Sequence, residues 1–155
     1  MAGYSSLDDL RILLAPAIAD AAAFDGWNGT ALAAAARVHD VDPAVAALAF
    51  PGGAMDMIAG WIAAIDAAMV AALPAEAVAT LPIRERIRTL VQFRLDTMAP
   101  QRESLRRALA IMAMPQNLAC ATKLGWRYTR YADDIVLSGG IHQIGRASCR
   151  ERVSS

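Results

Sequence analysis

The chain has 155 residues, 56% of them hydrophobic and only 6% aromatic, and its 15 basic and 15 acidic side chains give a formal net charge of zero. This length suits one domain that can bury a core without disulfides or a metal. The charge is uneven, because residues 1–83 sum to −7 and residues 84–155 to +7. Abundant alanine predicts an all-α fold, and the acidic half argues against a nucleic-acid partner.

The N-terminal residues are polar and acidic, and they lack the basic start and the small-residue cleavage site of a secretion signal. The two cysteines, Cys120 and Cys149, have no metal-binding spacing, and one pair is too few to indicate a secreted disulfide framework. We therefore expect a cytoplasmic protein. The first predicted helix follows Ser6 and runs from Leu7 to about Ala23.

Two short helices joined by a tight turn come next. Asn28 or Thr30 can cap the first, which ends near Val38, and Asp42 followed by Pro43 starts the second. This is the layout of a helix-turn-helix head. In a DNA-binding protein the second helix would enter the major groove, but its side chains here are those of proline, alanine, valine and leucine. We therefore expect that it reads no base.

A long apolar helix follows the Phe-Pro-Gly-Gly sequence that ends the head. Asp56 and Asp66 interrupt a run that otherwise approaches membrane-spanning length, so we predict a buried central helix. Trp61 lies beside an apolar stripe on this helix. The stripe consists of Ile58, Ile62, Ile65, Met69 and Leu73.

Pro82 opens the next predicted helix, whose apolar side chains should face inward. The inward set is Ile83, Ile87, Leu90, Val91, Leu95 and Met98. Three arginines, at positions 84, 86 and 88, lie largely on the outside. They form either a solvated surface or a surface attracted to acidic lipid headgroups or to an acidic partner.

Two further helices are predicted before the pattern ends. One runs from about Arg102 to Met114, and Asn117 can cap the other, which continues to Trp126 after a break at Pro115. The inner face of the first includes Leu105, Leu109 and Met112.

Several short motifs occur in order along residues 26–127: Gly26-Trp27, Thr30-Ala31-Leu32, Val41-Asp42-Pro43, Phe50-Pro51-Gly52-Gly53 with Asp56, Ala110 to Asn117, and Leu124 to Arg127. Together they resemble the ubiquinone-biosynthesis accessory family, the ninth Coq protein. The resemblance implies a TetR-like helical bundle without catalysis of its own. Such a protein binds isoprenoid lipids or quinone intermediates in an apolar cavity and presents them to the di-iron hydroxylase of the pathway. It also implies a homodimer in the intact family member, and a peripheral contact with the inner membrane that the C-terminal truncation would weaken.

On this interpretation, the candidate lipid-binding residues are Trp61, Ile65, Met69, Leu90, Val91, Leu109 and Met112, and the candidate partner-binding residues are Met114, Pro115, Asn117 and Trp126. We expect no catalytic residue, metal or cofactor, because the sequence has no paired nucleophile and base, no Gly-rich phosphate loop and no His cluster. A TetR-type transcriptional regulator is the alternative that the same fold leaves open.

Residues 128–155 depart from the family pattern. The string Tyr131-Ala132-Asp133-Asp134 resembles the catalytic hairpin of retron and group II intron reverse transcriptases, in which paired aspartates bind magnesium. A polymerase also needs a partner aspartate from a palm sheet, whereas the preceding residues predict helices. Residues 144–155 resemble a translated sequencing adapter. We expect a helical domain over residues 1–127, truncated at its C-terminus, and a foreign tail consisting of 128–143 and 144–155. An inactive reverse-transcriptase fragment is the second alternative.

Overall fold

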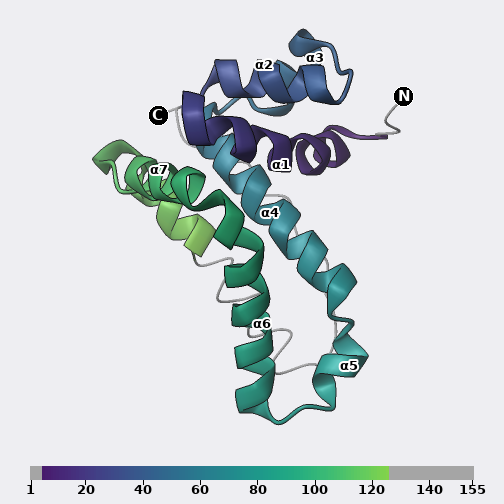
Figure 1. Cartoon of the computed structure of the whole chain (residues 1–155). Helices are drawn as coiled ribbons and strands as arrows, with labels where there is room; N and C mark the ends of the chain where they lie inside the picture. Colours follow the sequence, from purple (N-terminus) through teal and green to yellow (C-terminus); the bar gives the residue numbers. More distant parts are fainter. Residues whose placement is uncertain (1–4, 126–155) are drawn as a thin grey trace, which may run out of the picture.

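The structure is a computed structural model that describes residues 5–125, and all of its regular elements are helical, which confirms the predicted all-α class (Figure 1). In chain order these are α1 (Leu7–Asp25), α2 (Gly29–Val38), α3 (Pro43–Ala49), α4 (Ala54–Ala72), α5 (Ala75–Ala79), α6 (Ile83–Met98), the 3₁₀ turn η1 (Ala99–Gln101), α7 (Arg102–Met112) and the 3₁₀ turn η2 (Pro115–Asn117). Residues 118–125 form a last helical segment.

Side-chain caps fix where the first three helices begin. The Ser6 hydroxyl accepts a hydrogen bond from the backbone N–H of Asp9 (3.1 Å), and the Asp42 carboxylate accepts one from the N–H of Ala44 (2.7 Å). Asn28 caps α2 by accepting from two backbone N–H groups. Each cap satisfies N–H groups that the helix itself leaves unpaired. Of the two predicted caps for α2, Asn28 is therefore correct, and the helix starts at Gly29.

The main core lies where α1 meets α2, α3, α7 and the first half of α4. Alanines on α1 let its neighbours approach closely, and the largest fully buried side chains in this core are Leu10, Leu14, Ile18, Ile58 and Trp61. The Ser104 side chain of α7 is fully buried against α1, where its hydroxyl donates to the carbonyl oxygen of Ala19. Helices α1, α2, α3 and α7 thus form one packed unit with the first half of α4.

The second half of α4, α5 and α6 form an arm that extends away from the main core, with α5 at its far end (Figure 1). A smaller core of Met69, Val78 and Leu90 holds this arm together. Arg94 of α6 forms a partly buried ion pair with Asp66 of α4 (2.5 Å). The arm therefore rests on fewer buried side chains than the main core does.

The predicted inward face of the helix that begins at Ile83 is mostly wrong. Leu90 is buried, but four side chains of the set are exposed: Ile83, Ile87, Val91 and Leu95. Leu109 of α7 is also exposed, contrary to its predicted place on an inner face. The reason is that, among the described residues, α4 and α5 cover α6 on one side only. Helix α6 therefore has more apolar side chains than these neighbouring helices can bury.

Helix α4 is long and apolar enough to cross a membrane by length and composition. The core helix of a soluble protein meets the same criterion, and here Trp61, Ile65 and Met69 are buried within the protein. The burial of these side chains supports the predicted central helix.

The Glu103 carboxyl on α7 has a lowered pKa, which makes its contribution to stability depend on pH. Hydrogen bonds from Arg106 and then Arg107 lower the pKa of its carboxyl from 4.5 to about 2. A lowered pKa means that the stabilisation is present above pH 4.5 and is lost as the pH falls toward 2. Carbon-detected NMR of the Glu103 carboxyl should therefore give a midpoint near 2 in the folded protein. Arg106→Gln should raise that midpoint, and a wild-type midpoint near 4.5 would contradict the hydrogen bonds.

Candidate functional site

The seven predicted lipid-binding residues do not line one cavity. Trp61 and Ile65 belong to the main core, whereas Met69 and Leu90 belong to the arm core. The side chains of Val91 and Leu109 are exposed on α6 and α7. Met112 is partly buried and borders a pocket. Of the predicted set, only Met112 lines the apolar pocket described below.

Trp61 is held as a structural side chain. Its indole N–H donates to Oε1 of Gln101 (2.8 Å), and the Gln101 amide donates in turn to the Asp20 carboxylate (2.5 Å). The Trp61 ring lies 5.5 Å from that of Trp27, whose indole N–H donates to the carbonyl oxygen of Ser104 (3.0 Å). These contacts tie α4 and α1 to the start of α7, so the two rings position the bundle.

An apolar pocket of about 380 Å³ lies between the middle of α4, the end of α7 and the helical segment 118–125. The described residues that line it are Ile62, Met112, Ala113, Ala121, Leu124 and Gly125. The pocket is open to the surface rather than enclosed, and its volume lies within the range of small-molecule sites. None of these lining side chains carries a charge or a hydrogen-bonding group, so the site can bind an apolar group but offers it no acid, base or nucleophile.

The turn after α7 creates this pocket. Pro115 cannot continue a helix, and the Asn117 side chain donates to the carbonyl oxygen of Ile111 (2.9 Å). The chain therefore reverses, and residues 118–125 return beside the end of α7. Three predicted partner-binding residues, Met114, Pro115 and Asn117, form this turn. Trp126, the fourth, lies outside the described residues.

Five lining residues were absent from the predicted site: Ile62, Ala113, Ala121, Leu124 and Gly125. Alanine and glycine line the pocket by being small, which no sequence pattern distinguishes from ordinary helix packing. Ile62 and Leu124 belonged to predicted apolar helices, and periodicity alone does not separate a core position from a pocket wall. The position of Pro115 in the sequence was the available signal, because it predicts the chain reversal.

A second hollow of about 380 Å³ lies on the arm, between the end of α4 and the outer side of α6. Its lining includes Glu85, Arg88 and Asp96 beside Leu73 and Phe93. Opposite charges share this surface, so it has no single electrostatic preference. Among the described residues, no group of histidine, cysteine, aspartate and glutamate has a metal-binding arrangement.

The exposed side chains of α3 contain only carbon and hydrogen. They are Pro43, Ala44, Ala47 and Leu48, and the neighbouring exposed charges Asp40 and Asp42 are acidic. Specific reading of bases requires hydrogen-bonding side chains or methyl contacts together with attraction to phosphate. The exposed surface of α3 offers apolar groups but no hydrogen-bonding side chain or positive charge. The Tyr131 to Asp134 string lies outside the described residues.

Comparisons of the chain with family models, with curated proteins and with solved structures find no match. Over the described residues, the fold and the pocket define the class of the protein. It is an all-α protein with a small apolar pocket.

Proposed function

We propose that the protein is a non-catalytic binding protein for an isoprenoid lipid or quinone intermediate. The observation that carries this proposal is the apolar lining of the pocket bounded by Ile62, Met112 and Leu124. The described side chains that line the pocket are all apolar, which favours a ligand whose buried part is hydrocarbon, since burying an unpaired polar group would be unfavourable. The motif resemblance to the ubiquinone accessory family supports the same ligand class.

The proposed role is to hold such a lipid and present it to an enzyme, with the di-iron hydroxylase of ubiquinone synthesis as the candidate partner. The turn formed by Met114, Pro115 and Asn117 borders the pocket and includes an exposed methionine. A partner that contacts this turn would lie next to the pocket residues Met112 and Ala113. We propose a cytoplasmic location with peripheral membrane contact, because the ligand itself resides in membranes.

A TetR-type regulator is the weaker proposal. A regulator needs a recognition helix and phosphate contacts, whereas α3 exposes alanine and leucine next to Asp40 and Asp42. Operator binding with a steep salt dependence would reverse this ranking.

Filling the pocket tests the proposed function. Ala121→Trp should weaken binding of a short-tailed ubiquinone analogue about 10-fold or more, because the indole would occupy the volume that the ligand needs. The affinity is measured by isothermal titration in dilute detergent without vesicles. The matched control is Ala44→Trp, which places the same side chain on the exposed surface of α3. Absence of saturable binding by the wild-type protein, or equal affinity in both variants, would reject the proposal.

A further inference from the structure

Helix α6 carries a row of apolar side chains that the described residues leave uncovered. Ile83, Ile87, Val91 and Leu95 recur every four residues, and each is 47–60% exposed. Residues four apart lie above one another on a helix, so the four form a continuous strip along three turns. Leaving such a strip in water is unfavourable, and contiguous exposed apolar patches mark interaction surfaces.

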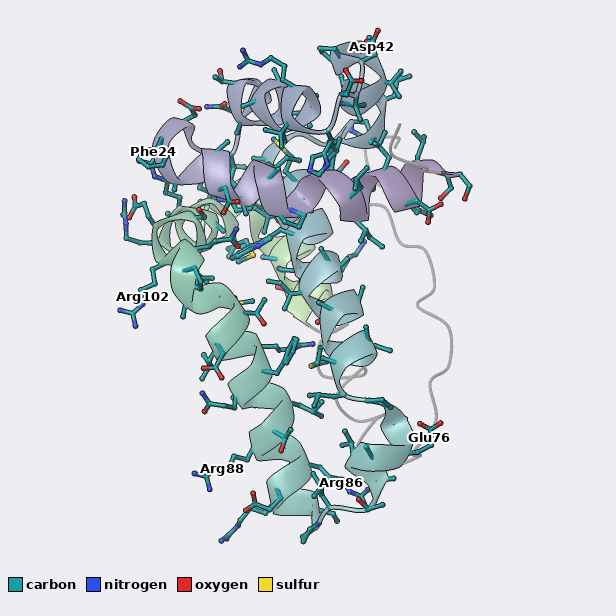
Figure 2. The ribbon with its side chains drawn as sticks, turned by 45° about the vertical axis from the view of Figure 1, so that its right-hand side comes forward. Phe24, Asp42, Glu76, Arg86, Arg88 and Arg102 are labelled. Atoms are coloured by element: carbon teal, nitrogen blue, oxygen red, sulfur yellow. The ribbon has the colours of Figure 1, made fainter. Side chains whose placement is uncertain are left out.

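Two exposed arginines lie beside the apolar strip on α6. At 100° per residue, Arg84 and Arg88 lie along its border with Val91 and Leu95. Both arginines are exposed, and neither makes a hydrogen bond or an ion pair with another described residue. Figure 2 shows Arg88 pointing away from the body of the arm.

The other arginines of α6 have structural roles. Arg86 donates from Nε to the carbonyl oxygen of Leu81 (2.6 Å) and also bonds the carbonyl of Ala79, which closes the turn beside α5 (Figure 2). Arg94 pairs with Asp66 of α4. The contrast leaves Arg84 and Arg88 as the cations of α6 that are available to an external anion.

The acidic residues of α6 lie on the opposite side of the helix from the strip. Glu85 and Asp96 line the second hollow, which Arg88 borders from the side of the strip, and Gln92 donates to the Asp96 carboxylate (2.8 Å). A second copy of the chain that packed strip against strip would bring arginines together without a carboxylate from either strip. The charge arrangement therefore disfavours self-association and favours an anionic partner with an apolar interior.

We propose that this side of α6, defined by Ile83, Ile87, Val91 and Leu95 with Arg84 and Arg88 and called here the α6 face, docks on the surface of an anionic phospholipid bilayer. The four apolar side chains enter the boundary between headgroups and acyl chains, and the two guanidinium groups bind lipid phosphates. The inference extends the proposed function, because it names the surface through which a lipid carrier would reach its source.

Vesicle binding tests the proposal with the full chain and without quinone. Wild-type protein should co-sediment with phosphatidylcholine vesicles that contain about 30% phosphatidylglycerol, and much less with pure phosphatidylcholine. Arg84→Gln combined with Arg88→Gln should weaken binding about 30-fold, because each basic residue near an anionic surface contributes about 5-fold. Ile87→Glu combined with Val91→Glu should weaken it about 10-fold or more, by removing insertion and adding repulsion.

The matched control is Leu48→Glu, which changes an equally exposed apolar residue on α3 and should leave vesicle binding unchanged. Circular dichroism establishes that each variant folds, and the arginine pair is fully on the surface, so at least one variant reports on docking. Equal binding of wild type and both double variants would overturn the proposal. It would also be overturned by a wild-type dimer that ignores vesicles and becomes a monomer on Ile87→Glu with Val91→Glu. Loss of quinone binding in detergent would reject the pocket and leave this test intact.

Discussion

Replacing Trp61 with alanine should lower the free energy of unfolding by about 3–5 kcal/mol, the typical effect of truncating a large aromatic side chain in a core. Trp61 is 2% exposed, contacts the Trp27 ring and donates a hydrogen bond to Gln101. The change would remove the ring and leave the amide oxygen of Gln101 without its donor. Urea unfolding followed by circular dichroism measures the effect.

Trp61→Phe separates packing from hydrogen bonding. Phenylalanine keeps most of the apolar volume but cannot donate to Gln101, so the loss should be about 1–2 kcal/mol. Quinone affinity of the folded fraction should stay unchanged in this variant, because Trp61 does not line the pocket. Unchanged stability in Trp61→Ala together with weakened ligand binding would show that Trp61 is a ligand contact and not a core residue.

Ser104→Leu should destabilise the protein by about 3 kcal/mol or more, combining overpacking with the loss of a buried hydrogen bond. Ser104 is fully buried where α7 crosses α1, and its hydroxyl donates to the Ala19 carbonyl. A leucine side chain there would push α7 away from α1 at Ala19. The displacement would also strain the bond from Trp27 to the carbonyl oxygen of Ser104. Urea unfolding midpoints measure the destabilisation.

Ser104→Ala is the matched control for size. It deletes the hydroxyl without adding volume, so its cost should be about 1 kcal/mol, the typical net contribution of one hydrogen bond. If both variants unfold at the wild-type urea concentration, α7 does not pack on α1 at this residue.

The sequence predicted the helix starts well because the signals are local. Ser6, Asn28 and the Asp42-Pro43 pair act on backbone groups within three residues of themselves, so no tertiary knowledge is needed. The buried central helix followed from Asp56 and Asp66, which argue against a membrane span, and from the apolar stripe that runs from Ile58 to Leu73. Trp61 and Ile65 on that helix are indeed buried.

The inward face of α6 could not be predicted. The spacing of apolar residues shows that one side of a helix is apolar, but it does not show which element packs against that side. Leu90 packs with Met69 and Val78, whereas Ile87 and Val91 are exposed in the described part of the chain. For the same reason Trp61 was assigned to a lipid site. Periodicity places core and pocket residues alike, and only the packed structure separates them.

The pocket was hidden for a different reason. Its wall includes Ala113, Ala121 and Gly125, which contribute empty volume rather than a side chain that a pattern can detect. The volume arises from the reversal at Pro115, where the Asn117 side chain bonds the Ile111 carbonyl. A break of this kind can be read from a sequence, but the space that it leaves between three helical segments cannot.

The most direct test of the proposed function is an intermolecular NOE experiment on methyl-labelled protein with a short-tailed ubiquinone analogue. We predict NOEs between the isoprenoid protons of the ligand and the methyl groups of Ile62, Met112 and Leu124, which line the pocket. Methyl groups of Leu14 and Ile18 in the main core should show none. Saturable binding with NOEs elsewhere on the protein, or no binding at all, would contradict a lipid site between α4, α7 and residues 118–125.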